Sequence, residues 1–200
     1  MNIIKSIKSN IGFIIALIFF AIIVINPDAK ALLMRGLMKT GLFAPDVSNL
    51  QPKPAGTTTE PAGPVAPPVS FTSLDGKTLD LASLKGKVVF INFWATWCPP
   101  CVAEMPSVNS LFNKMKNNDN VVFIMVDVEN KLKSSEAFMK KNKYDLPVYA
   151  PAAYLPEELF TGSLPTTVII NKNGEIIFKH EGMADYNSGE TEKLLNDLSK

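Results

Sequence analysis

Apolar residues are distributed differently in the first third of the chain and in the remainder. Residues 11–25 form a run without a charge or a hydrogen-bonding side chain, and Lys5 and Lys8 precede it. An apolar run near the N-terminus behind a basic flank is typical of an export signal or a membrane anchor, and a buried core helix explains it poorly. We therefore expect residues 1–28 to form a signal-anchor or transmembrane segment.

Two interpretations of this segment stay open. As a cleaved signal peptide it would end after Ala31, because Pro27 breaks the helix and Ala29 and Ala31 supply a small-residue cleavage site. As an uncleaved anchor it is short, since fifteen residues at about 1.5 Å each reach about 22 Å of a roughly 30 Å hydrocarbon core.

Two segments of different composition follow. Residues 29–43 mix large apolar side chains with widely spaced cations, which predicts an amphipathic stalk that lies in the membrane interface or packs on its own domain. Residues 44–69 contain seven prolines and three charges, and such a composition cannot bury a core. We expect a stiff linker that reaches up to roughly 80 Å at about 3.1 Å per residue, and a folded body that begins near Ser70.

Residues 70–200 alternate between strand-like and helix-like patterns. Asp75-Gly76 between two short strand-like runs is a hairpin signal. The continuous apolar runs 87–93 and 121–128 are typical of strands buried on both faces. This order predicts an α/β domain with a mixed central sheet flanked by helices. The remaining expected elements are helices at 100–116, 134–143 and 188–198, a strand at 146–149, a helical turn at 156–160, and a hairpin of 166–171 with 175–180.

Charge and composition exclude several classes of function. The 20 Lys and Arg residues against 19 Asp and Glu leave a formal net charge of +1, which gives no basic field of the kind that a nucleic-acid-binding protein needs. The positive excess lies in residues 1–43, with five cations and one anion. Two cysteines and one histidine are too few for a disulfide-dense scaffold or a zinc site built from these ligands. We expect no metal and no cofactor.

The strongest chemical signal is the pair Cys98-Pro99-Pro100-Cys101, which follows a predicted buried strand and opens a predicted helix. Both sulfurs can then meet across one helical turn, and the helix dipole favours a thiolate on Cys98. Covalent haem attachment requires histidine after the second cysteine, where Val102 stands. A redox-active pair is therefore favoured over a metal half-site or an inert disulfide.

Segment 90–106, which contains the cysteine pair, and segment 162–174 together resemble the thioredoxin superfamily, and within it the membrane-tethered bacterial TlpA/ResA-type thiol-disulfide oxidoreductases. The resemblance implies a thioredoxin-like fold over 70–200, with an N-terminal hairpin and an inserted β-α element at about 121–149. It also implies a disulfide reductase anchored to the cell membrane, with its catalytic domain on the extracytoplasmic, periplasmic side. Protein thiols and disulfides would be its substrates, a membrane electron donor would recharge it, and cytochrome c maturation is the role most suggested.

The resemblance further implies roles for individual residues. Cys98 would be the attacking thiol and Cys101 the resolving thiol of a reversible disulfide. Glu104 would relay protons, because Asn92 stands where cytoplasmic thioredoxins keep a buried aspartate and cannot titrate. The alternative for Glu104 is a favourable interaction with the helix dipole alone. At the substrate side, Pro165 would be a cis-proline, the backbone of Leu164 would pair with an extended substrate strand, and Trp97 would cover the disulfide.

Two other functions stay open on the same fold. A peroxidase of the peroxiredoxin group is one, although the residues before Cys98 lack the proline that the peroxidatic motif carries in register. A copper- or thiol-binding chaperone is the other, and it requires His180 to reach the sulfurs.

Overall fold

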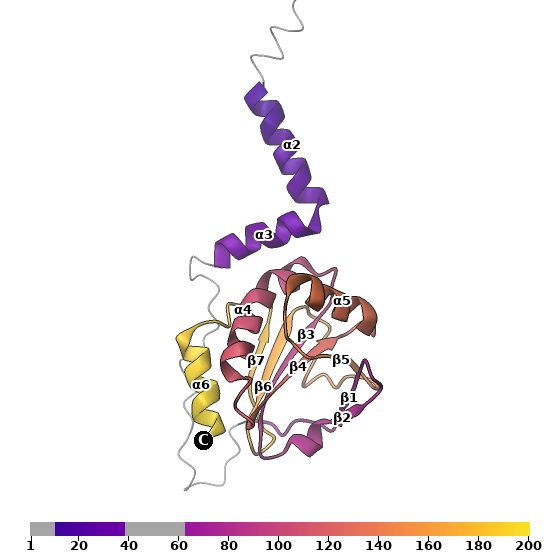
Figure 1. Ribbon diagram of the computed structural model, residues 1–200, viewed down its shortest axis with the longest axis vertical. Coiled ribbons are helices and arrows are strands. Elements are labelled where there is room, and N and C mark those ends of the chain that lie inside the picture. Colours follow the sequence, from indigo (N-terminus) through magenta and orange to yellow (C-terminus); the bar gives the residue numbers. More distant parts are fainter. Residues whose placement is uncertain (1–10, 39–62) are drawn as a thin grey trace, which may run out of the picture.

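The computed structural model describes residues 11–38 and 63–200, and a seven-stranded sheet forms the centre of this part of the chain (Figure 1). The strands are β1 (Ser70–Ser73), β2 (Thr78–Asp80), β3 (Val88–Trp94), β4 (Val121–Asp127), β5 (Val148–Pro151), β6 (Thr166–Ile170) and β7 (Ile176–Glu181), in the order β2-β1-β5-β4-β3-β6-β7 across the sheet. β3 pairs in parallel with β4 and antiparallel with β6. The mixed sheet confirms the α/β layout.

The central strand β3 explains why both faces of the sheet are covered. All seven of its residues are buried, and alternate side chains enter two separate core clusters. Val88, Phe90 and Trp94 face the cluster that includes residues of helices α4 (Pro99–Met115), α5 (Leu132–Asn142) and α6 (Gly189–Ser199). The opposite face is covered by the short 3-10 helix η1 (Leu81–Leu84) and by the helical turn at 156–160.

The folded body begins earlier than the linker composition indicates. Most of the expected linker lies outside the described residues, but its last residues pair with the hairpin of β6 and β7. The backbone N–H of Ala66 donates to the Gly174 carbonyl at 2.8 Å, and the N–H of Ile176 donates to the Pro64 carbonyl at 2.8 Å. Proline lacks an N–H but keeps its carbonyl acceptor, so a proline-rich segment can still pair at a sheet edge. The body therefore starts near residue 64 rather than at Ser70.

The strand β5 is also displaced from its expected position, to Val148–Pro151 from 146–149. Its two neighbours set these limits. Val148 pairs with Met125 of β4, and Pro151 pairs with Phe71 of β1. Strand ends that depend on a partner distant in sequence are not visible in a local apolar pattern.

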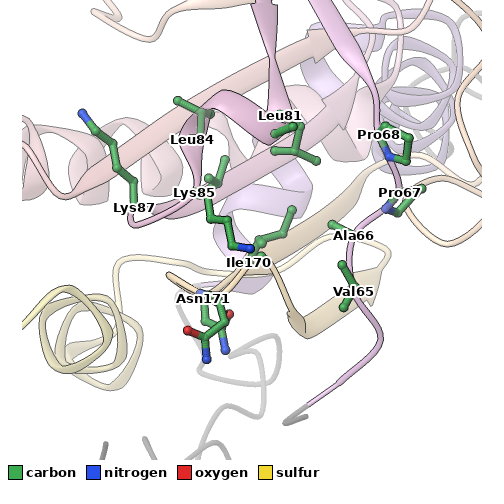
Figure 2. A pocket seen from close by; sticks show the side chains of 14 residues that line it. Val65, Ala66, Pro67, Pro68, Leu81, Leu84, Lys85, Lys87, Ile170 and Asn171 are labelled. Carbon is green, nitrogen blue, oxygen red and sulfur yellow. Dashed lines mark hydrogen bonds between the residues drawn. The ribbon is translucent and has the colours of Figure 1, made fainter.

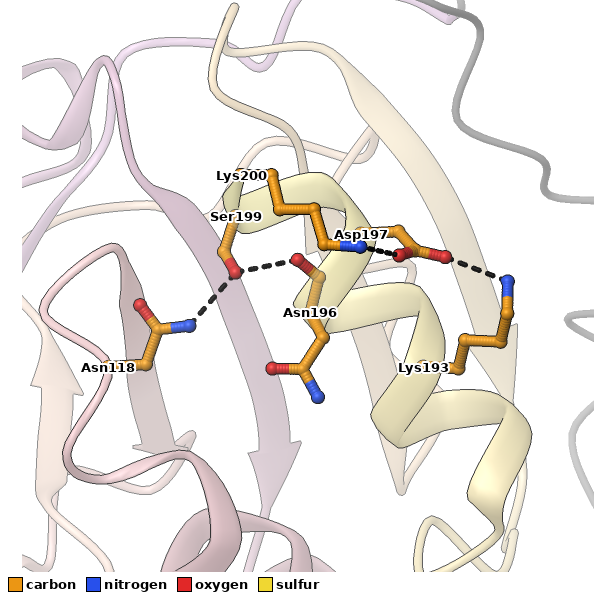
Figure 3. A network of polar contacts seen from close by, with 6 residues as sticks. All are labelled: Asn118, Lys193, Asn196, Asp197, Ser199 and Lys200. Atoms are coloured by element: carbon orange, nitrogen blue, oxygen red, sulfur yellow. Dashed lines mark hydrogen bonds and ion pairs between the residues drawn. The ribbon is translucent and has the colours of Figure 1, made fainter.

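The chain end is held against the sheet by α6 (Figure 3). The hydroxyl of Ser199 accepts a hydrogen bond from Asn118 Nδ2 at 2.9 Å and donates to the Asn196 carbonyl at 2.9 Å. On the solvent side, Asp197 contacts Lys193 and Lys200. Exposed pairs of this kind contribute little to stability, so the buried leucines of α6, Leu194 and Leu195, supply most of the attachment.

Two helices precede the domain. α2 (Ile11–Ile25) projects away from the domain, whereas α3 (Pro27–Met38) lies along the end of α4 (Figure 1). Within residues 11–38 and 63–200, no single helix is both long and apolar enough to cross a membrane. The segments Ile11–Ile25 and Ala29–Leu37 meet that criterion only together, across a 95° bend. Helix α3 covers most of the expected amphipathic stalk and packs against α4.

Asp127, at the end of β4, should be a large contributor to stability. Its buried carboxylate accepts hydrogen bonds from the backbone N–H groups of Glu129 and Lys131 and from the Ser135 hydroxyl, at 3.0, 2.9 and 2.7 Å. Asp127→Ala leaves these donors without their acceptor, and we expect it to lower the free energy of unfolding in urea by about 2–3 kcal/mol. The exposed Asp145 is the matched control, with a loss below about 0.5 kcal/mol expected for Asp145→Ala. Equal losses would contradict the prediction.

Candidate active site

The two cysteines lie between the end of β3 and the first turn of α4 and are joined in a disulfide with an S–S distance of 2.06 Å. Cys98 caps the helix, and Pro99 and Pro100 occupy its first two positions, where the missing proline N–H groups have no intrahelical partner to lose. Cys98 is 4% exposed and Cys101 is fully buried. Cys98 is therefore the more accessible residue of the pair.

The local backbone favours negative charge at Cys98. Its sulfur accepts a hydrogen bond from the backbone N–H of Cys101 at 3.3 Å. The unpaired N–H groups and the positive end of the helix dipole act on the same atom. When the disulfide is reduced, the geometry therefore stabilises a thiolate on Cys98 rather than on Cys101.

Glu104 lies one helical turn beyond Cys101 and is completely buried. Its Oε1 accepts a hydrogen bond from Asn92 Nδ2 at 2.7 Å, and its Oε2 accepts one from the backbone N–H of Ala184 at 3.1 Å. Burial raises the pKa of Glu104 to about 8, against the lowering effect of these two hydrogen bonds. The carboxyl group therefore holds its proton at neutral pH and can exchange it in the range where thiols titrate.

Sequence reasoning missed the remainder of this buried polar cluster. Asn92 Nδ2 also donates to the Thr167 hydroxyl at 2.9 Å. The hydroxyl of Tyr186 is buried near Thr167 and Glu104 without a hydrogen bond of ordinary geometry, and burial together with the Glu104 charge raises the pKa of Tyr186 well above its usual range. Thr167 lies 75 positions after Asn92, and Tyr186 lies 82 positions after Glu104, so no local motif indicates them.

Three hydrogen bonds attach the loop after β7 to α4 along one helix face. Besides the bond to Glu104, Ser107 Oγ accepts from the backbone N–H of Tyr186 at 3.2 Å. Ser110 Oγ donates to Asn187 Oδ1 at 2.8 Å. Glu104 is thus held between the cysteine helix and the loop that leads into α6, which fixes the position of its carboxyl group.

The segment Leu164–Pro165 lies at the same end of the sheet as the cysteine pair. The peptide bond between these residues is cis. Thr166, which follows, pairs with Phe93 near the end of β3, and Leu164 packs against both core clusters. Trp97 is 58% exposed, whereas Trp94 is fully buried in the core. Of the two tryptophans, Trp97 is therefore the one whose ring is accessible at the surface.

One cleft of the described structure lies away from this site. It has a volume of about 280 Å³ and lies where residues 65–68 cross the sheet next to Leu81 and Leu84 (Figure 2). Val89 and Ile170 line it at the opposite ends of β3 and β6 from Trp94 and Thr166. None of the expected site residues borders it.

The possible metal ligand His180 lies on β7, where it pairs with Thr167 and stacks on Phe178 with ring centroids 6.1 Å apart. In the part of the chain that the structure describes, no group of three or more His, Cys, Asp or Glu residues is placed to hold a metal ion.

Comparison with known proteins gives a consistent result. The Redoxin family matches residues 61–198. A thiol-disulfide oxidoreductase ResA from Bacillus cereus (strain ZK / E33L) is 37% identical over 118 residues, which are 58% of this chain and 68% of that protein. A thiol:disulfide interchange protein of the thioredoxin family from Chlorobium tepidum TLS is 26% identical with a TM-score of 0.54, covering 72% of this chain and 100% of that one. StoA from Bacillus subtilis is 25% identical with a TM-score of 0.53, covering 65% and 99%. The sheet and its helices therefore have a thioredoxin-like fold.

Proposed function

The chain belongs to the Redoxin family and is a thiol-disulfide oxidoreductase, and on that premise we propose that it is a disulfide reductase acting through Cys98 and Cys101. The observation that carries the proposal is the asymmetry of the pair. One sulfur caps the helix, is slightly exposed and accepts a backbone hydrogen bond, and the other is fully buried one turn further on.

The reaction consumes one dithiol and one substrate disulfide. The Cys98 thiolate attacks one sulfur of the substrate, which breaks the substrate S–S bond, forms a mixed disulfide and releases the first substrate thiolate. The Cys101 thiolate then attacks the Cys98 sulfur, closes the intramolecular disulfide and releases the second substrate thiolate. Two electrons pass from the enzyme to the substrate, and the enzyme ends in the oxidised state that the structure contains.

Glu104 is proposed to handle the proton of the resolving thiol. It stands three residues after Cys101 on α4, which places the two side chains on the same side of the helix. With a pKa of about 8, it can take the Cys101 proton when that thiol becomes a nucleophile and return it on reduction. Asn92 and Ala184 hold the carboxyl group in place for this transfer.

The substrate is proposed to be a protein segment in extended conformation. The backbone of Leu164, before the cis-proline Pro165, would pair with it, and Trp97 would contact its apolar side chains. This arrangement recognises main chain rather than one particular side chain, so it is compatible with several protein thiol and disulfide substrates.

The domain is proposed to act on the extracytoplasmic side of the cell membrane, tethered through the N-terminal segment. The support is the exposed, wholly apolar α2 and the proline-rich stretch that follows the stalk. A membrane electron donor would return the disulfide to the dithiol. Keeping the haem-binding cysteines of cytochrome c reduced is the proposed role.

The reduction potential of the pair tests the direction of electron flow. Burial of both sulfurs opposes the stabilisation that the helix dipole gives to the Cys98 thiolate, so the reduced form is stabilised less than in a strong oxidant. We expect a potential nearer to the roughly −270 mV of thioredoxin than to the roughly −120 mV of a periplasmic oxidase. Equilibration of the full chain with glutathione and dithiothreitol buffers, with free thiols counted, measures it. A value near the oxidase end would make the protein an oxidant.

A further inference from the structure

Helix α3 is attached to the helix that carries the cysteine pair. Ala31 is 1% exposed and packs against Val102 and Ala103 of α4, both of which are buried. Met34, Phe138 and Met183 complete this small apolar cluster. Val102 directly follows Cys101, so α3 contacts the domain at its redox-active end.

A polar contact at the same place has a specific cause in the sequence. Pro106 lies inside α4 and has no N–H, so the carbonyl of Val102, four residues earlier, lacks its helical donor. Arg35 Nη2 donates to that carbonyl at 3.0 Å. The proline therefore leaves an acceptor on the surface of α4, and α3 supplies the missing donor from 67 residues away.

The opposite side of α3 is apolar and exposed. At about 100° per residue, Ala31, Met34 and Arg35 lie on one face of the helix, and Leu32 and Leu33 lie on the other. Leu32 is 68% exposed and Leu33 is 51% exposed. Helix α2 leaves α3 on the side away from the domain (Figure 1), through a bend of 95°. The exposed leucines and the apolar α2 therefore lie on the same side of α3, away from the domain.

We propose that α3 is an orienting helix that lies between the lipid bilayer and α4 and holds the Cys98–Cys101 end of the domain against the membrane surface. Lipid is the occupant of the leucine face because that face lies on the same side of α3 as the wholly apolar α2. With α2 inserted along the bilayer normal, the 95° bend directs α3 along the surface.

Docking of α3 also determines how far from the bilayer a partner meets the cysteine pair, and this consequence rests on the proposed membrane tether. The 24 residues between Met38 and Gly63 could otherwise let the domain move up to about 75 Å from the bilayer at roughly 3.1 Å per residue. Docking of α3 removes that freedom and presents the cysteine pair close to the membrane plane. A dithiol protein embedded in the membrane fits this presentation as the electron donor, because its own thiols lie near that plane.

Energy transfer from tryptophan to a dansyl-labelled lipid tests the orientation. Both tryptophans of the chain, Trp94 and Trp97, are at the cysteine end, so their emission reports the position of that end. The full chain is reconstituted in neutral phosphatidylcholine vesicles that contain dansyl-phosphatidylethanolamine. We compare the parent with Ala31→Leu/Arg35→Ala, which overfills the buried Ala31 site and removes the donor, and with the conservative Ala31→Ser/Arg35→Lys.

We expect efficient transfer in the parent and in the conservative variant. In the disruptive variant we expect transfer to fall by at least about twofold, because the tether then lets the domain leave the surface. Co-flotation with the vesicles checks that every variant remains bound, and insulin reduction checks that the site is intact. As a second route, Leu32→Glu/Leu33→Glu changes only the lipid-facing side and should lower transfer as well.

Low transfer in the parent, or equal transfer in all variants, would overturn the proposal. Low transfer together with a stable dimer would assign the leucine face to a second copy of the chain and would overturn it equally. The proposed function fails separately: if transfer follows the expected pattern and no variant reduces insulin, the orientation stands and the reductase assignment does not.

Discussion

Replacing Cys98 with serine is expected to lower insulin reduction by at least about 10³-fold, to the background of the dithiothreitol that drives the assay. The reason is that Cys98 is the slightly exposed sulfur of the pair and the one that receives the Cys101 N–H and the helix dipole. A serine hydroxyl at the same place does not ionise near neutral pH. The measurement is the initial rate of turbidity from full-length protein at fixed dithiothreitol.

The same substitution at Cys101 provides the matched comparison. Cys101→Ser should leave the attack on the substrate intact but remove the thiol that releases it. Mixed disulfides with the substrate should therefore accumulate on Cys98 and appear by mass spectrometry under non-reducing conditions. Adducts on Cys101 in the Cys98→Ser variant, or full activity in either variant, would reverse or remove the assigned roles.

Glu104→Gln is expected to stabilise the oxidised protein above pH 8, relative to the parent, by roughly 5 kcal/mol more than it does at pH 4.5. The pKa of Glu104 is raised from 4.5 to about 8 by burial. Below pH 4.5 both the folded and the unfolded parent hold the proton. Between pH 4.5 and 8 the unfolded chain loses it while the folded chain keeps it, so the parent loses stability as the pH rises. Above pH 8 the difference is constant.

Urea denaturation of the parent and the variant at a series of pH values measures this difference, in which other titrating groups largely cancel. Glu158→Gln, at an exposed position, removes the same charge and should follow the parent within about 0.5 kcal/mol at every pH. A Glu104→Gln curve that runs parallel to the parent from pH 4.5 to 9 would show that Glu104 is ionised in the folded state, and it would remove the basis for proton transfer near neutral pH.

Much of the secondary structure could be read from the sequence because its signals are local. The buried strands β3 and β4 are continuous apolar runs, and α4 carries apolar residues at helical spacing. Both hairpins of the domain surround a glycine with positive φ, Gly76 or Gly174, where other residues are strained. The displaced β5 and the early start near residue 64 escaped this reasoning because both depend on partners distant in sequence.

The candidate site likewise contains residues that the sequence indicates and residues that only the fold brings together. Cys98 and Cys101 are evident from a spacing of three residues. Glu104 is suggested only by the family resemblance, and its surroundings are not visible in the sequence at all. Its pKa depends on complete burial and on Asn92 and Ala184, which come from β3 and from the loop after β7. Tyr186 and Thr167 enter the cluster only because β6 and β7 pair beside β3.

By itself the sequence determined the redox chemistry, the α/β class and the apolar N-terminal segment, because these follow from residue type and short-range periodicity. Only the tertiary structure decided the depth of the cysteine pair, the protonation of Glu104 and the attachment of α3 to α4. Each of these depends on which groups meet across tens of residues and on how much water they exclude. The Val102 carbonyl illustrates both contributions. The sequence alone shows that Pro106 removes the helical donor of this carbonyl, and only the fold brings Arg35 to it as a replacement.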